Sequence, residues 1–311
     1  MVKQRVGAAL ISWFDTSVAE TNSTDRRIDW LRTAPFIAMH VACLGVIWVG
    51  WSPFAVATAV ALYAVRMLAI TGFYHRYFSH RSFATSRALQ AVFAFIGATA
   101  VQRGPLWWAA HHRHHHNRSD QPDDTHSPNQ DGFIWSHVGW FLSRANFPIR
   151  EERVPDLLRF PELRFLDRFD IFAGVVLAVS LYALGSVLDR FVPMLGVTGA
   201  QLLICGFFIS TVVLYHATFT INSLAHRLGR RRYATGDQSR NNAILALLTF
   251  GEGWHNNHHH YPASARQGFY WWEIDVTWYF LKLLESLGLI WNLREVPPTR
   301  LEANRVGVET P

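Results

Sequence analysis

Four long apolar blocks constrain the fold of this chain more than any other feature of its sequence. They lie at about residues 34–51, 54–73, 171–188 and 200–221. Each approaches the roughly 20 apolar residues that an α-helix needs to cross a bilayer. Backbone polar groups inside a bilayer must be paired within the protein, and continuous apolar blocks of this length achieve this as helices. The sequence therefore predicts an all-α integral membrane protein with four transmembrane helices in two hairpins.

The links within each hairpin are short, whereas the charged residues lie in the long segments. The first link is Trp51–Pro53 and the second is Asp189–Gly199. Two hairpins place both termini on one side, and the excess of Arg and Lys assigns that side to the cytoplasm. We therefore expect a polar segment at residues 1–33, a membrane domain at 34–275 and a cytoplasmic segment at 276–311. A bacterial inner membrane is the expected location.

Charge and cysteine content exclude two other classes of site. The formal net charge is +6, but no basic low-complexity tail or nucleic-acid motif accompanies it. Such a balance fits a protein beside anionic lipid, and we expect no nucleic-acid partner. The two cysteines, Cys43 and Cys205, both lie inside apolar blocks. The histidines therefore do not complete a cysteine-based zinc finger.

Nine histidines form spaced groups beside the apolar blocks. They are His75 and His80; His112, His115 and His116; His226; and His255, His258 and His259. The spacing i, i+3, i+4 in both HxxHH groups puts three imidazoles on one helix face. His75 and His80 are five apart, so we expect the helix to end or bend between them. Imidazoles without cysteine suit iron, copper, zinc or nickel, and nine ligands are enough for two ions.

The other histidines and one asparagine are interpreted separately. Asn222 lies four residues before His226 on the same helical face, where it could hold a metal-bound water. Three isolated histidines are interpreted as surface or satisfied core residues: His40, His137 and His216. Three more neighbour the groups at the wrong helical phase and are expected nearby or exposed: His111, His114 and His260. His126, in an acidic segment, stays open between the two interpretations.

The order HxxxxH, HxxHH, HxxHH resembles the membrane fatty-acid desaturase superfamily, and within it the acyl-CoA (stearoyl-CoA, delta-9) desaturase branch. Four further segments are similar to that branch: Gly72–Arg81, Ser136–Trp140 (SHVGW), Asn222–His226 (NSLAH) and Gly251–Asn256 (GEGWHN). The similarity covers about residues 35–275.

This resemblance implies a cytoplasmic helical cap in which the nine histidines hold two iron ions, with Asn222 contacting a metal through water. It also implies an O2-dependent reaction that places a cis double bond at carbon 9 of a saturated long-chain acyl thioester. Gln102, Trp108 and Thr218 match positions that shape the bend of the acyl tunnel. Trp108 could instead be an interfacial anchor, and Thr218 could bond within its helix.

The chain departs from the animal enzymes immediately before the second histidine group. Those enzymes carry an Arg-Asp pair that meets CoA, whereas this chain has Ala110 and His111. Arg103, Arg144 or the basic run 227–232 could bind CoA or a lipid phosphate instead. We recognise no haem-binding or flavin-binding extension. The expected electron source is a separate ferredoxin or small haem protein with its NAD(P)H reductase, attracted by the basic face.

Two alternatives use the same sequence features. A hydroxylase could use the same metal centre, because the product depends on small differences in substrate placement. A membrane metal carrier would instead need metal-handling residues inside its spans. The predicted spans contain few such residues, mainly His40, Arg66 and His216.

Overall fold

The computed structural model of this chain describes residues 7, 10–18 and 24–307. It is mostly helical, and β1 (Ala84–Thr85) and β2 (Ile290–Trp291) pair antiparallel with Ala84 opposite Trp291. The predicted helical architecture is confirmed. The predicted polar segment at residues 1–33 falls partly outside the described residues.

Four helices are long and apolar enough to cross a membrane, as predicted: Trp30–Val49, Pro53–Ser79, Phe172–Phe191 and Gly199–Ser223. The first contains α2 (Trp30–Ala42), η2 (Cys43–Gly45) and α3 (Val46–Val49). The second contains α4 (Pro53–Leu68) and the π-helix η3 (Ala69–Ser79). The third is α11 (Phe172–Phe191), and the fourth contains α12 (Gly199–Gln201), the π-helix η8 (Leu202–Ile209) and α13 (Ser210–Ser223).

Local signals explain where these spans begin and end. Asp29 caps α2 by accepting the N–H of Arg32, so the first span begins before its apolar block. Gly50 ends α3 with a φ of 67°, and Ser52 then caps α4 by accepting the N–H of Ala55. The predicted short turn between the first two spans is therefore present.

Arg66, one of the few polar residues in the predicted spans, is buried inside the second span. Its guanidinium donates to the hydroxyl oxygens of Thr211 and Ser210, each at 2.6 Å, and to the carbonyl of Thr99. Arg66 thus pairs with polar groups of α13 instead of extending to the interface. These bonds tie α4 to α13 and to the end of α5.

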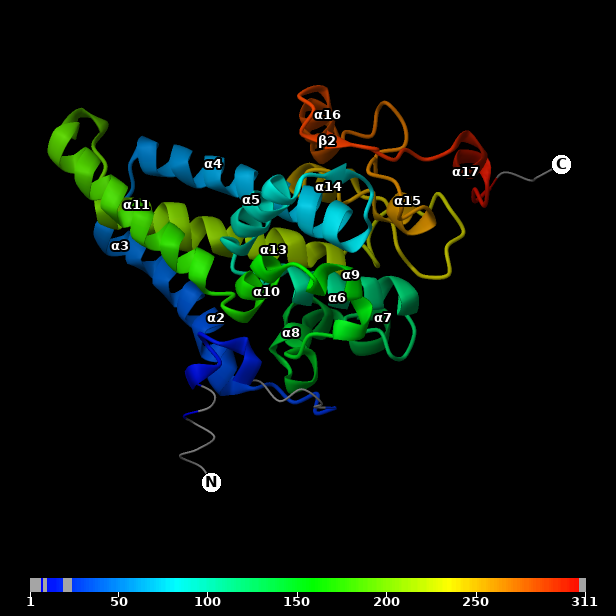
Figure 1. The fold of residues 1–311 in the computed structure, drawn as a ribbon, viewed down its shortest axis with the longest axis horizontal. Coiled ribbons are helices and arrows are strands. Elements are labelled where there is room, and N and C mark those ends of the chain that lie inside the picture. Colours follow the sequence, from blue (N-terminus) through cyan, green and yellow to red (C-terminus); the bar gives the residue numbers. More distant parts are fainter. Residues whose placement is uncertain (1–6, 8–9, 19–23, 308–311) are drawn as a thin grey trace.

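The remaining helices lie between the second and third spans or beside the fourth. Between the spans are α5 (Arg87–Ala98), α6 (Pro105–Arg118), α7 (Pro128–Asp131), η4 (Trp135–Gly139), α8 (Trp140–Leu142), η5 (Arg144–Asn146), η6 (Glu151–Arg153), α9 (Pro155–Leu158) and α10 (Pro161–Arg168). Beyond them are η7 (Pro193–Leu195), α14 (Ala243–Leu248), α15 (His255–His260), α16 (Val276–Ser286) and α17 (Pro298–Glu302), and η1 (Thr16–Val18) precedes the spans. Figure 1 shows α6 and α15 at one end of the bundle, away from the loop that follows α11. The two histidine-rich helices therefore share one end of the molecule.

Candidate metal centre

The helix α6 carries the first HxxHH group. Pro105 opens it, and the buried carboxylate of Asp167 accepts the N–H of Trp107 in its first turn at 2.8 Å. Proline is favoured at this position because its missing N–H has no intrahelical partner there. The helical spacing then turns His112, His115 and His116 toward the other histidines, as predicted.

The π-helix η3 resolves the five-residue spacing of His75 and His80. A π-helix repeats at i, i+5, so both rings reach the same side although an α-helix would separate them. Their centroids lie 4.9 Å apart, and His80 is the residue that caps the end of η3. The prediction that the helix ends or bends here is confirmed.

The short helix α15 carries the second HxxHH group. Gly253 precedes it because a side chain at this position would meet the backbone nitrogen of Ala246 at 2.0 Å. The side-chain oxygen of Asn256 accepts the N–H groups of Arg232 and Tyr233, each at 2.8 Å. These contacts hold α15 against the loop after α13. The GEGWHN segment is thus a structural support for His255, His258 and His259.

The nine predicted histidines separate into two groups. The first contains His75, His80, His112, His116 and His258, and the second contains His115, His226, His255 and His259. Within each group, one ring nitrogen of every residue lies within 4.8 Å of the others. Figure 1 shows that the helices bearing them come from distant parts of the chain. The arrangement is that expected for two ions, while metal binding itself stays a prediction.

The nitrogen atoms of both groups fit a cation. Nε2 of His258 lies 3.0 Å from Nε2 of both His75 and His116, and its buried Nδ1 has no hydrogen-bond partner. The Nε2 atoms of His75, His116 and His258 converge, and a single proton cannot bridge all three. In the second group, His259 donates Nδ1–H to Asp237, and its buried Nε2 is also without a hydrogen-bond partner. A divalent ion would satisfy such lone pairs, and imidazole is a suitable ligand for iron.

Burial keeps several of these imidazoles in the neutral form that a metal requires. Burial, reinforced by repulsion between neighbouring histidines, lowers the pKa of five of them well below the usual value: His80, His112, His116, His255 and His258. A neutral ring keeps one lone pair for coordination.

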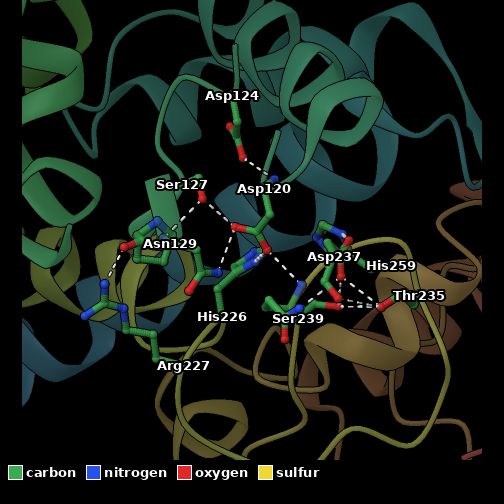
Figure 2. Close-up of polar contacts among 12 residues, drawn as sticks. Asp120, Asp124, Ser127, Asn129, His226, Arg227, Thr235, Asp237, Ser239 and His259 are labelled. Carbon is green, nitrogen blue, oxygen red and sulfur yellow. Dashed lines mark hydrogen bonds and ion pairs between the residues drawn. The ribbon is translucent and has the colours of Figure 1, made fainter. Parts of the chain in front are cut away.

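Four buried carboxylates orient the ligands, and sequence reasoning missed all four. Asp120 accepts Nδ1–H of His226 at 2.9 Å, Asp124 accepts that of His115 at 3.0 Å, and Asp237 accepts that of His259 at 2.6 Å. Figure 2 shows Asp120 and Asp237 directed at His226 and His259. Glu252 bonds Nδ1 of His75 in the same way. A carboxylate on Nδ1 fixes the tautomer and turns Nε2 toward the metal.

These carboxylates are held as anions. Burial alone would raise the pKa of Asp120, Asp124 and Asp237, but their bonds to the histidines outweigh it and lower each pKa below its usual range. Burial also opposes ionisation of Glu252, yet His75 and Arg76 lower its pKa to about 2. The sequence signal available was the acidic segment after the first HxxHH group, but its pairing depended on the fold.

The remaining histidines bond to other groups. His111 and His114 are buried and bond the backbone oxygens of Pro148 and Asp123. His260 bonds the carbonyl of Arg300. None of these three belongs to either histidine group, and of the two expected outcomes His111 and His114 are nearby and buried instead of exposed. His126 stacks on His115 with centroids 4.2 Å apart and lies beside Asp124.

The three histidines interpreted as isolated are bonded to one another. His40 Nε2 lies 3.1 Å from Nε2 of His216, and His216 Nδ1 lies 3.0 Å from Nε2 of His137. They are thus satisfied by hydrogen bonds and lie outside both histidine groups, as interpreted, but their pairing across α2, α13 and η4 was not predicted.

An apolar cavity of about 430 Å³ reaches the first histidine group. Its wall includes all three predicted substrate residues, Gln102, Trp108 and Thr218, together with His112 and Asn222. Gln102 donates to the Thr218 hydroxyl at 2.9 Å, while Thr218 also bonds within its own helix. Trp108 stacks on His112 with centroids 5.0 Å apart. The cavity volume lies in the range of small-molecule sites.

The positions considered for carrier binding differ in accessibility. Ala110 and His111 are buried at 0% and 1% exposure, so neither offers an open surface to a head group. Arg103 lines the cavity and lies 3.4 Å from Asp170. Arg144 pairs with Asp25 and Asp29, and Arg232 in the basic run pairs with Glu273. Of these arginines, Arg103 is thus the candidate at the apolar cavity.

The fold and site together define a class: a helical membrane protein with two histidine groups, the first of which adjoins an apolar cavity. The family model for fatty acid desaturases matches residues 21–290. The chain belongs to the fatty acid desaturase family, and it is therefore an oxidoreductase of lipid metabolism.

Named relatives include desaturases of both lipid-linked and CoA-linked acyl groups. An sn-1 stearoyl-lipid 9-desaturase of Anabaena variabilis is 38% identical over 88% of this chain and 96% of its own length. An sn-2 palmitoyl-lipid 9-desaturase of Nostoc sp. is 35% identical over 91% of this chain and 96% of its own length. An acyl-CoA 5-desaturase of Anemone leveillei is 39% identical over 82% of this chain and 76% of its own length.

Proposed function

We propose that this protein is an O2-dependent desaturase that forms a cis double bond at carbon 9 of a saturated long-chain acyl group. The observation that carries the proposal is the apolar cavity whose wall includes His112 of the first histidine group. Two iron ions held by the nine histidines would supply, with O2, the oxidising power that an unactivated methylene requires. One hydrogen leaves each of two adjacent carbons. O2 takes them up with two electrons and two protons, giving two waters.

The protein's own residues bind and orient the chain. The cavity wall excludes water, and the Gln102–Thr218 hydrogen bond fixes the wall beside Trp108. Holding one carbon pair close to the ions would replace a random encounter with a fixed geometry. Asn222, in the same wall, is proposed to bind a metal through water.

The proposed carrier is an acyl thioester such as acyl-CoA, and an ester of a membrane lipid is the competing carrier. The relatives' names include both. Arg103 at the cavity would suit the phosphate of either. The electrons are proposed to come from a separate ferredoxin or small haem protein and its NAD(P)H reductase. We place the histidine end and both termini in the cytoplasm, in a bacterial inner membrane.

The direct test is fatty-acid profiling in a host that expresses the chain, with the double bond located by mass spectrometry. A new carbon-9 alkene that requires O2 supports the proposal. An alcohol without an alkene would favour the hydroxylase, and metal transport without O2 consumption would favour a carrier. Purified protein given stearoyl-CoA or stearoyl phospholipid, with iron and a reductant, then separates the two carriers.

A further inference from the structure

A hydrogen-bonded histidine ladder joins three elements on the outside of the acyl cavity. It consists of Ser223, His137, His216 and His40 and ends at the carbonyl of Phe36. Ser223 Oγ lies 2.9 Å from His137 Nδ1, and His137 Nε2 lies 3.0 Å from His216 Nδ1. The Nε2 atoms of His216 and His40 are 3.1 Å apart, and His40 Nδ1 lies 2.8 Å from the Phe36 carbonyl oxygen. It therefore links α13 and η4 to α2.

One set of neutral tautomers satisfies every contact of the ladder. His40 Nδ1 faces a carbonyl and must donate, which leaves its Nε2 as an acceptor for Nε2–H of His216. His216 Nδ1 then accepts from Nε2–H of His137, whose Nδ1 accepts the Ser223 hydroxyl when that proton turns from the Phe219 carbonyl to the ring. No charged imidazole is required, which suits a ladder that reaches into an apolar region.

The ladder supports the aromatic wall of the acyl cavity. Phe36, Phe141, Tyr215 and Phe219 all line the cavity. Phe36 stacks on Tyr215 with centroids 5.7 Å apart, and Tyr215 stacks on Phe219 at 5.7 Å. The carbonyl that ends the ladder belongs to Phe36 itself. Moving α2 would therefore move this ring and change the shape of the cavity.

Few packing contacts hold α2 in place. Thr33 is the one buried residue of this helix, which packs mainly on η8 and on α8. Figure 1 shows α2 and α8 side by side near the edge of the bundle. Within a bilayer, helices associate through packing and interhelical hydrogen bonds, so a helix with so little packed surface depends more on its hydrogen bonds.

We propose that His40, His137 and His216 are positioning residues that hold α2 against α13 and thereby set which carbon pair of the acyl chain lies at the metal centre. This inference rests on the proposed desaturase function. None of the three histidines belongs to a metal group, so the ladder affects the place of the double bond and the chain length accepted, while iron binding is unaffected.

The test compares products of wild-type protein, His216→Leu, His40→Leu and the double variant, using saturated acyl chains of several lengths. We expect the ratio of minor to major double-bond isomers to rise on the order of tenfold in each single variant. The double variant should resemble either single variant, because one break removes the whole ladder. Iron content should stay at the wild-type value.

Two further variants separate positioning from general damage. Glutamine offers one donor and one acceptor, so His216→Gln should return the isomer ratio toward wild type. Tyr182→Leu, at a 52% exposed position on α11, is the matched control and should leave the ratio unchanged. Unchanged isomers and chain-length range in His216→Leu would overturn the proposal, as would loss of iron in both single variants. Wild-type protein without any desaturase product would instead overturn the proposed function.

Discussion

Asp120→Asn is the most informative change at the candidate metal centre. Asp120 Oδ2 accepts Nδ1–H of His226 at 2.9 Å and the N–H of Gln238 at 2.8 Å. Oδ1 accepts from Ser127 at 2.5 Å and from Asn129 at 3.0 Å. Asp120 has a φ of 59°, a conformation that asparagine also adopts readily. The substitution therefore removes the charge and leaves the backbone and side-chain shape in place.

The expected loss follows from the role of the charge. Asparagine can still offer one oxygen to His226, but it no longer raises the basicity of that ring. Changes of this kind reduce metal affinity or activity by roughly 10–100-fold. At about 1.4 kcal/mol per factor of ten, the metal site loses about 1.4–2.8 kcal/mol. Asp120→Ala should lose more, because all four hydrogen bonds disappear and alanine tolerates the positive φ less well.

The assay measures iron affinity by competition with a chelator, alongside desaturase turnover. The matched control is Asp123→Asn, three residues away, whose carboxylate pairs with Arg118 at the surface and is 56% exposed. An exposed pair of this kind contributes at most about 1 kcal/mol, so Asp123→Asn should behave as wild type. Wild-type iron affinity and turnover in Asp120→Asn would refute the reasoning about carboxylate support.

Three other changes test separate parts of the structure. His258→Ala should abolish turnover and lower iron content, because Nε2 of His258 lies between those of His75 and His116; metal analysis of the purified variant checks this. Gln102→Ala removes the bond to Thr218 and should broaden the accepted chain lengths, measured by competition between saturated substrates, while iron stays bound. Burial raises the pKa of Asp167 to about 7, so the folded state binds more protons than the unfolded state between pH 4 and 7, and stability falls as pH rises through that window. Asp167→Asn should remove this dependence of the unfolding free energy on pH, which amounts to a change on the order of 4 kcal/mol across the window. Thermal unfolding at pH 5 and pH 8 should then give midpoints that lie closer together than those of wild type.

Local rules were sufficient for the spans and for the nine histidines. Apolar length predicted four crossing helices, and i, i+3, i+4 spacing predicted which histidines share a face. The end of the second span was harder, since an α-helical period does not bring His75 and His80 together. The π-helix that does so is a property of the packed structure.

Partners distant in the sequence could not be predicted in this way. Asp120 and His226 are separated by 106 residues, and His40 and His216 by 176. Each residue alone resembles an ordinary polar side chain, and only the fold shows that it is half of a pair. The isolated histidines were therefore assigned no role, although they form the ladder.

The two histidine groups differ in the charge that surrounds them, which predicts unequal metal affinities. The second group has three carboxylates on its rings, from Asp120, Asp124 and Asp237. The first has Glu252, whose charge is shared with the buried guanidinium of Arg76. At an effective dielectric constant of about 20, one unit charge at about 6 Å changes the energy of a neighbouring unit charge by roughly 3 kcal/mol. The first group has one more histidine than the second, but a neutral imidazole adds no negative charge to balance the metal ion.

Limited chelation should therefore remove iron from the first group before the second. In the loaded protein we expect a fast and a slow phase of about one ion each. Asp237→Asn should accelerate the slow phase, because His259 loses its anionic partner. Glu252→Gln should act mainly on the fast phase. A single phase for both ions, or acceleration of the same phase by both variants, would contradict this assignment of charge to affinity.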